Sequence, residues 1–425
     1  MQRAMTASYI KQRCDTVLCW LIPLFLLVDC VNGALLQLYG SSYSVSLWYK
    51  VVVLALMAIA TLLQQPKWAL TLLLLLLGML LGPALHWPEL ARRWMLADVQ
   101  LAVKALSPLL AFSYLTALAG RAPLSARRLL QHTLTLSAIV LLLNALAGVA
   151  GLGFTAYQPL DGVAQSFLGI KGFFYSTNEL SAVLLVISAA LLCLSWPQHK
   201  LAYVLCSITA LLLALSLLTK TGLFGVMLLV LLVPLLLQPA QFWQQQKKLL
   251  LAFSALLLLA LLLLLANAEA LLKLLGIYDK LSFVYQQRGL SGILLSSRDY
   301  YAGQIWQSVS THYPDWQRML GVGQGSIALY LKKYFAELDW FDLYVFYGVA
   351  GIATFLLTFA LFIRHSWQRA GQGAGRVLLL LNLLLLAVAS MAGHILSSGM
   401  LWLPWALCNA LLLQSAAKAE VANKR

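Results

Sequence analysis

The chain has 425 residues, of which 62% are hydrophobic and only 10% are charged, and its formal net charge is +15. About a quarter of the residues of an ordinary soluble domain are charged, so this composition excludes a soluble globular fold. A basic excess in so apolar a chain indicates membrane topology, and no nucleic-acid partner is expected.

Long apolar runs recur along the whole chain, and each is long enough to cross about 30 Å of hydrocarbon as a helix. The runs do not alternate as the strands of a membrane barrel would. About twelve spans are predicted, and they begin near residues 16, 47, 68, 97, 129, 173, 201, 221, 249, 341, 377 and 399. The predicted fold is an all-α polytopic membrane protein, a single integral membrane domain over residues 1–425. No cleavage site follows the first helix, which is expected to remain as an anchor.

The distribution of charge predicts the orientation of the helices. An even number of spans places both termini on one side of the membrane. If that side is the cytoplasm, the inner segments hold 16 of the 29 basic residues and two of the 14 acids. This asymmetry is what the positive-inside rule expects, with Arg92 and Arg93 as the main exception. Most acids therefore lie in the helices or on the outer side, where chemistry is expected.

No metal or other cofactor is expected from the sequence. It has no nucleotide-binding loop, dinucleotide fingerprint, catalytic triad or cluster of metal ligands. The six cysteines show neither paired nor metal-type spacing, and free thiols are expected. They are Cys14, Cys19, Cys30, Cys193, Cys206 and Cys408.

The segment "GIKGFFYSTNELSAVLLV" places polar residues at the outer entrance of the sixth span. Lys171, Asn178 and Glu179 are candidate substrate-binding residues there. Asn178 and Glu179 occur at positions within the apolar helical pattern, so their polar groups need hydrogen-bond partners inside the protein. The alternative is that they only tie helices together.

Lys220 lies in "LSLLTKTGLFGVMLL", in a short break between the seventh and eighth spans. A lysine at such a depth can hold a phosphate as a point charge. The alternative is a lysine that snorkels to the outer surface.

A long hydrophilic segment, residues 268–340, follows the ninth span and is predicted to be a large outer loop that contains short helices. Its "QQRGLSGILLSSRDYYAGQIW" stretch holds Arg288 and Arg298. An arginine fork suits a phosphate or pyrophosphate, because its donors match two oxygens at once. The alternative is that Arg298 caps a helix or pairs with Asp299 or Asp315.

Three carboxylates close the loop in "YFAELDWFDLYVFYGVAG", namely Glu337, Asp339 and Asp342. On a helix, Asp339 and Asp342 share a face, so both are expected to point into one cavity. Two like charges near a low-dielectric boundary raise at least one pKa and create a proton acceptor. The alternative, an interfacial belt that faces water, explains Glu337 but not Asp342, because intramembrane acids are costly.

Two further features are interpreted as structural. The glycines of "LGVGQG" indicate a tight turn, and without a preceding strand they are a weak signal for anion binding. His394, in "MAGHILSSGM", is isolated in the sequence and is interpreted as a structural or interfacial histidine.

Taken in this order, the patches resemble the O-antigen ligase and O-antigen polymerase family of bacterial surface polysaccharide assembly. The resemblance covers roughly residues 165 to 360. It lies in "GFFYSTNEL", "LLTKTGLFG", "SSRDYYAGQIW" with "LGVGQG", and "ELDWFDLYVFYGVAG". It implies a protein of the bacterial inner membrane with cytoplasmic termini and an active site that faces the periplasm.

Two departures from the ligase pattern favour the polymerase branch. Ligases carry a histidine eleven residues before a Gly-x-x-Gly, and Gly348 and Gly351 place Glu337 at that position here. Lys220 stands where ligases usually have an arginine. The resemblance therefore implies a polymerase more than a ligase.

The implied reaction is metal-independent, inverting glycosyl transfer from a glycan on undecaprenyl pyrophosphate. Arg298, Lys220 and Arg288 would bind the pyrophosphate, while Glu337 or Asp339 would accept the proton of the acceptor hydroxyl. Membrane lipid is a second expected partner, and binding of a chain-length regulator is left open. The alternatives are a ligase that transfers glycan to lipid A core, and, from other classes, a lipid-linked oligosaccharide flippase or transporter or an envelope scaffold protein.

Overall fold

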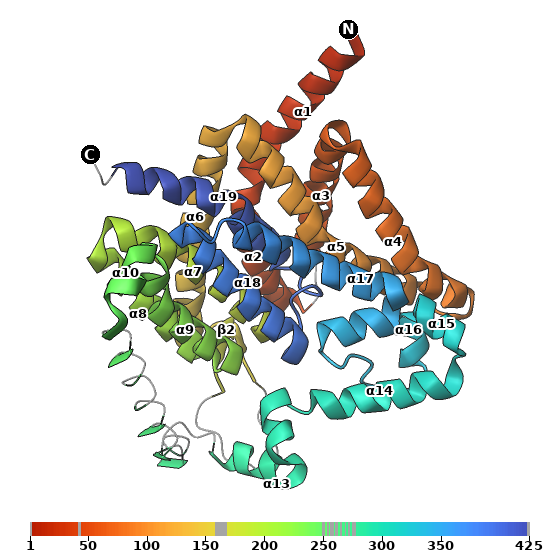
Figure 1. Cartoon of the computed structure of the whole chain (residues 1–425). Helices are drawn as coiled ribbons and strands as arrows, with labels where there is room; N and C mark the ends of the chain where they lie inside the picture. The colour runs from red at the N-terminus through yellow and green to blue at the C-terminus, as the bar shows by residue number, and fades with distance from the viewer. Residues whose placement is uncertain are drawn as a thin grey trace.

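A computed structural model describes residues 2–40, 44–157, 168–248 and 278–422, with isolated residues between 249 and 277. The described chain is mostly helical (Figure 1). The first ten helices are α1 (Gln2–Leu21), α2 (Phe25–Tyr39), α3 (Val45–Gln64), α4 (Pro66–His86), α5 (Arg92–Arg121), α6 (Pro123–Val149), α7 (Thr177–Gln198), α8 (Lys200–Leu217), α9 (Lys220–Leu236) and α10 (Ala240–Gln245). After the partly described segment come α13 (Tyr278–Leu295), α14 (Arg298–His312), α15 (Asp315–Leu320), α16 (Gly323–Ala328), α17 (Asp339–Trp367), α18 (Gly373–Met391) and α19 (Trp402–Ala422).

Short elements complete the described chain. Two 3₁₀ turns, η1 (Ile22–Leu24) and η2 (Trp87–Glu89), follow α1 and α4. Strands β1 (Phe154–Thr155) and β2 (Ile170–Gly172) pair antiparallel, with Phe154 opposite Gly172.

The all-α polytopic membrane architecture predicted from composition is confirmed at this level. Within the described residues, nine helical segments are long and apolar enough to cross a membrane, and α1, η1 and α2 together form the first. Two shorter apolar helices, α9 and the first part of α19, also coincide with predicted spans. The span predicted to begin near residue 249 lies largely outside the described residues. All six cysteines are free, as expected.

The centre of the bundle is α7, which packs against α8, α9 and α19. Every residue from Leu180 to Ala190 is buried. A helix that is apolar on all sides has no face to offer to water, so it is stable only when other helices surround it. α5 and α19 also pack against each other beside α7.

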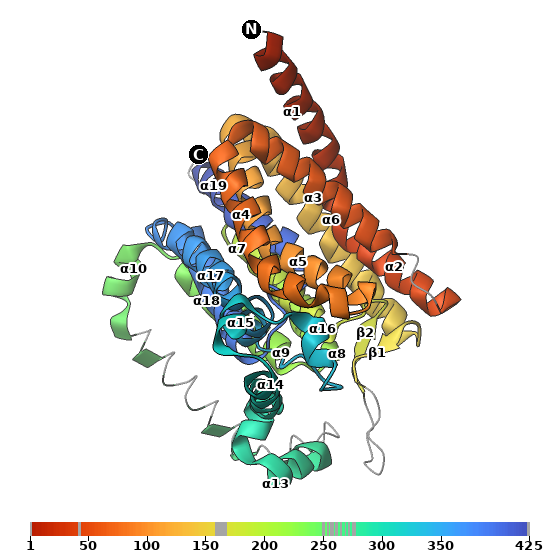
Figure 2. The same ribbon diagram turned by 90° about the vertical axis from the view of Figure 1, so that its right-hand side faces the viewer.

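The two ends of the bundle differ in what they carry. α1 begins and α19 ends at one end, and α13 and α14 lie at the other (Figures 1 and 2). We call these the terminus end and the loop end. An ion pair between Arg121 and Asp15, with an N–O distance of 2.6 Å, joins the end of α5 to α1. Arg121 also donates to the Gln64 side chain of α3 at 2.6 Å.

The "LGVGQG" glycines allow α15 and α16 to pack closely on α17 and α5. Gly321 and Gly323 have positive φ, and the N–H of Val322 donates to the carbonyl of Val345 in α17 at 3.0 Å. The N–H of Gln324 donates at 2.8 Å to the carboxylate of Asp98, which is fully buried on α5. The turn therefore serves packing, and Asp98 supplies a hydrogen-bond acceptor at the N-terminus of α16.

Gly348 kinks α17 beneath this turn, with φ 59° and ψ −142°. A Cβ at Gly348 would overlap the carbonyl oxygen of Met319. We expect Gly348→Ala to destabilise the protein by more than about 2 kcal/mol, because it adds left-handed backbone strain to a steric overlap. The apparent melting temperature in detergent measures this effect.

Gly371→Ala is the matched control, because nothing lies within 4 Å of a Cβ at that position. Its melting temperature should equal that of the wild type. Equal melting temperatures for the Gly348 and Gly371 variants would show that the kink tolerates a side chain.

Candidate active site

An ion pair between Arg298 and Glu337 lies where α14 begins and the segment before α17 ends. The Arg298 Nη2 donates to the Glu337 Oε2 at 3.0 Å, and its Nη1 donates to the Leu295 carbonyl at 3.4 Å. Only 9% of the Arg298 side chain is exposed. Among the described residues, no hydrogen-bond acceptor reaches its Nε. The structure thus joins the predicted pyrophosphate ligand to a predicted catalytic carboxylate, and Asp315 pairs with Arg318 instead.

Three basic side chains surround the Glu337 carboxylate. Besides Arg298, the Lys333 Nζ lies 3.3 Å from Oε1 and the His394 Nε2 lies 3.9 Å from Oε2. Burial raises the pKa of Glu337, but His394, Lys333 and Arg298 together lower it more, so the pKa lies below its ordinary value. The carboxylate is therefore ionised at neutral pH, and 28% of the side chain remains exposed.

Asp342 holds the backbone of Glu337 in place. Its carboxylate accepts the N–H groups of Ala336 at 2.9 Å, Glu337 at 2.9 Å and Leu338 at 3.2 Å. Glu337 has a φ of 65°, which is uncommon for a residue with a side chain. Such a conformation persists only where its surroundings fix it, and the buried Asp342 supplies that constraint.

Asp339 organises a second loop, residues 392–401, which precedes α19. Its carboxylate accepts the N–H groups of His394 at 3.0 Å, Ile395 at 2.7 Å and Leu396 at 3.0 Å. It also accepts the Ser397 hydroxyl at 3.0 Å. These bonds bring His394 to Glu337.

The structure differs from the expectation that Asp339 and Asp342 point into one cavity. Each carboxylate is buried and accepts hydrogen bonds from a different loop. Helical spacing alone suggested a shared face, but unpaired loop N–H groups need acceptors, and each carboxylate supplies them. This geometry favours positioning roles for both residues, and leaves Glu337 as the most exposed of the three.

His394 is the site residue that sequence reasoning missed. It lies far along the chain from Glu337, and nothing near it in sequence indicates chemistry. Its positive φ of 63° and its place beside Glu337 arise from the bonds to Asp339. The sequence offers one indication of this contact, namely that a buried carboxylate such as Asp339 needs N–H donors. It does not show that the loop of residues 392–401 supplies them.

The other two predicted pyrophosphate ligands contact the segments that flank Arg298. Lys220, at the start of α9, donates to the Ile293 carbonyl and lies 3.4 Å from the Ser296 hydroxyl. The Arg288 guanidinium lies 4.5 Å from the centre of the Tyr300 ring on α14. Both side chains are exposed, so the loop end presents three basic residues in one region.

The polar residues at the start of α7 serve different partners. Lys171 donates to the Tyr175 carbonyl at 2.9 Å, and burial lowers its pKa. Glu179 accepts the Ser398 hydroxyl at 2.6 Å and the Gly399 N–H at 2.8 Å. Asn178 is half-buried at the beginning of the helix. Glu179 therefore ties α7 to the same loop that carries His394, as the alternative reading of the sequence described.

No family model, curated protein or solved structure matches this chain.

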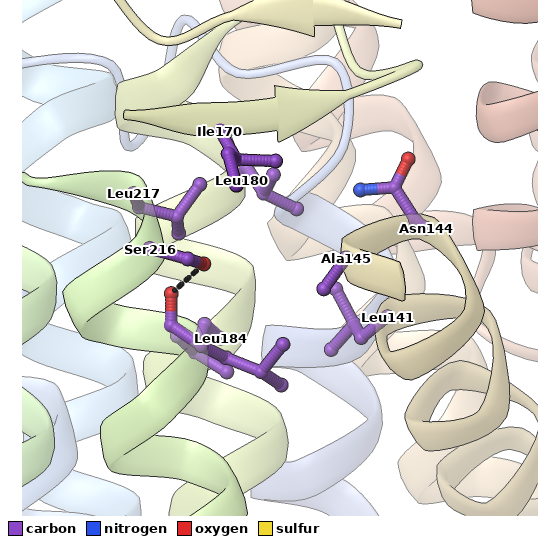
Figure 3. A pocket seen from close by; sticks show the side chains of 9 residues that line it. Leu141, Asn144, Ala145, Ile170, Leu180, Leu184, Ser216 and Leu217 are labelled. Atoms are coloured by element: carbon purple, nitrogen blue, oxygen red, sulfur yellow. Dashed lines mark hydrogen bonds between the residues drawn. The ribbon is translucent and has the colours of Figure 1, made fainter. Parts of the chain in front are cut away.

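A small cavity beneath the β1–β2 hairpin offers no competing site. Leucines of α6, α7 and α8 face one another around it (Figure 3). Its two polar side chains are already engaged. Asn144 binds the backbone of β2 and Phe173, and Ser216 donates to the Leu213 carbonyl at 2.8 Å. This cavity is suited to packing.

The loop end can bind an anion and accept a proton in one place. A guanidinium has five N–H donors, and among the described residues Arg298 donates only to Glu337 and to the Leu295 carbonyl. Glu337 is an ionised carboxylate with exposed surface. Within the described residues, no group of three or more His, Cys, Asp or Glu side chains could hold a metal ion. Arg298 can bind an anion, and the adjacent Glu337 carboxylate can accept a proton.

Proposed function

We propose that this chain is a membrane glycosyltransferase that polymerises lipid-linked oligosaccharide repeat units. The 3.0 Å contact between Arg298 and Glu337 carries the proposal, because it places a permanent cation beside an ionised carboxylate. The resemblance of the surrounding segments to the polysaccharide polymerase branch supports it. The reaction would take place at the periplasmic face of the bacterial inner membrane, with the termini on the opposite side.

In the proposed reaction, the donor is a growing glycan on undecaprenyl pyrophosphate. Arg298 binds the pyrophosphate, and Lys220 and Arg288 add positive charge from the flanking segments. A sugar hydroxyl of the acceptor repeat unit attacks the anomeric carbon as the bond to the pyrophosphate oxygen breaks. Glu337 accepts the hydroxyl proton, and the electron pair of the broken bond leaves with the pyrophosphate.

Attack opposite the leaving group inverts the anomeric carbon. The Arg298 guanidinium is planar, so the edge that binds Glu337 leaves its remaining N–H donors for the leaving group. Asp342 and Asp339 act as positioning residues, because the first fixes the Glu337 backbone and the second brings His394 beside its carboxylate.

The experiment that tests this function uses the purified full chain in proteoliposomes with lipid-linked repeat units as the only substrate. A polymerase converts them into a ladder of longer lipid-linked glycans. Transfer that occurs only after lipid A core is added would refute polymerisation in favour of a ligase. Translocation of labelled repeat units without any lengthening would refute glycosyl transfer in favour of a flippase.

A further inference from the structure

A second pair of basic residues lies away from Arg298, where α3, α5 and the loop before α19 meet. A Cβ placed on Gly399 would lie 3.5 Å from the Lys50 Nζ and 3.9 Å from the Lys104 Nζ. The two ammonium groups therefore face the same small space beside the backbone of Gly399.

One of these two ammonium groups has no direct partner among the described residues. Lys50 pairs with Asp29 at 2.6 Å, and Ser46 also donates to Asp29. The nearby Glu179 carboxylate accepts bonds from the loop before α19. Within the described part of the chain, neither a hydrogen bond nor an ion pair reaches Lys104, which is half-buried. A cation at this depth needs an anionic partner or water.

The helices give the depth of the pair. Gln64 and Arg121 contact each other near the terminus end of α3 and α5. At a rise of 1.5 Å per residue, Lys50 lies about 21 Å along α3 from Gln64, and Lys104 about 26 Å along α5 from Arg121. With Gln64 and Arg121 taken as one boundary of a hydrocarbon layer about 30 Å thick, both ammonium groups lie in the part of the layer nearest the loop end, and a long lysine side chain there can reach a lipid phosphate.

An apolar groove begins beside these lysines and continues toward the terminus end. It runs between α3, α4 and α5, which lie side by side (Figure 2), and has a volume of about 320 Å³. Leu54, one turn after Lys50, and Val103, directly before Lys104, both line it. Leucines and alanines make up nearly all of the remaining lining, so the groove matches a hydrocarbon chain in chemistry.

The loop before α19 connects this pair to the Arg298–Glu337 site. Asp339 holds its beginning at His394, and Glu179 holds its end at Gly399. Five residues of extended chain span at most about 17 Å. A short oligosaccharide that starts at the lysines can therefore reach Glu337 with its far sugar.

We propose that Lys50 and Lys104 bind the phosphate of the acceptor lipid, whose hydrocarbon chain occupies the groove between α3, α4 and α5. This assignment rests on the proposed function, because joining two lipid-linked glycans requires two lipid phosphates in one protein at once. Arg298 binds the donor phosphate and Lys104 the acceptor phosphate. The acceptor glycan then extends along residues 394–399 toward Glu337.

Native mass spectrometry of the purified full chain with undecaprenyl monophosphate tests the proposal without any turnover. The wild type should bind two lipids. Lys104→Ala and Arg298→Ala should each bind one, and the double variant none. Two bound lipids in Lys104→Ala would overturn the proposal. Lys67→Ala, which removes an exposed lysine from the first turn of α4, is the matched control and should bind two.

A second variant keeps every charge. Gly399→Ala places a methyl group in ordinary contact distance of both lysines, and it should weaken the Lys104-dependent binding at least tenfold without unfolding the protein. Unchanged affinity in this variant, with the wild-type melting temperature, would also overturn the proposal. Displacement of the second undecaprenyl monophosphate by an equal concentration of phosphatidylglycerol would refute an acceptor site in favour of a general anionic-lipid site.

Kinetics separate this proposal from the proposed function. In elongation assays, Lys104→Ala should raise the KM for acceptor at least tenfold and leave the KM for donor unchanged. A wild-type protein that shows Lys104-dependent lipid binding but no elongation would refute the polymerase function and leave the lipid-phosphate site standing. Elongation that is insensitive to Lys104→Ala would refute the acceptor assignment and leave the polymerase standing.

Discussion

Replacing Glu337 with glutamine should lower the rate of glycan elongation by about 10²–10⁴-fold, the usual contribution of a general base. The introduced glutamine keeps nearly the same shape and can still accept a hydrogen bond from Arg298, but it cannot take up a proton. The initial rate of elongation in proteoliposomes, with lipid-linked repeat units as substrate, measures the effect. The KM for the lipid-linked repeat units should change little, because Arg298 remains.

Asp299→Asn is the matched control, because Asp299 is an exposed carboxylate adjacent to Arg298 on α14. It should elongate at close to the wild-type rate. Wild-type chain lengths in Glu337→Gln would exclude Glu337 as the proton acceptor and direct attention to His394.

Because the pKa of Glu337 is lowered, the difference in stability between the wild type and Glu337→Gln should depend on pH. A carboxyl group whose pKa is lowered in the folded state stabilises the protein at pH values above its pKa in the unfolded state, here 4.5. It loses that contribution as the pH falls through the pKa of the folded state. The wild type should therefore melt at a higher temperature than Glu337→Gln at neutral pH, and the difference should shrink below pH 4.5.

The helical fold could be predicted from sequence because its signal is local. Continuous apolar runs predict membrane helices wherever they occur, and the runs that became α7 and α17 show this. The short helices between residues 278 and 328 were expected only in outline. Glycines with positive φ, such as Gly321 and Gly323, and tertiary contacts determine where these helices begin and end, and apolar periodicity predicts neither.

The candidate site was predicted in part, because the sequence shows which residue types are present but not which of them the fold brings together. The chemistry of Arg298 and Glu337 can be read from their residue types, whereas their contact depends on a fold that brings residues 39 positions apart together. The roles of Asp339 and Asp342 depend on loop N–H groups that no sequence pattern identifies. Likewise, the sequence does not explain why the apolar helix α5 carries Asp98. The structure does, because the N–H of Gln324 in α16 donates to the Asp98 carboxylate.

Asp342→Asn should cost about 3–5 kcal/mol of stability and should also impair elongation. An asparagine offers one oxygen acceptor where the carboxylate serves three N–H groups, and its amide group would face donors. Asp315→Asn is the control, because 86% of the Asp315 side chain is exposed and surface ion pairs contribute little. The apparent melting temperature and the elongation rate measure the two effects.

Amide hydrogen exchange then distinguishes a positioning role of Asp342 from a catalytic one. If Asp342 fixes the Glu337 backbone, Asp342→Asn should speed exchange at the amides of residues 336–338, and Glu337→Gln should leave that exchange unchanged. Slow exchange in Asp342→Asn, together with lost elongation, would instead mean that Asp342 acts on the substrate itself. Because Asp342 is buried with all three bonds directed at the backbone, the structure favours the first outcome.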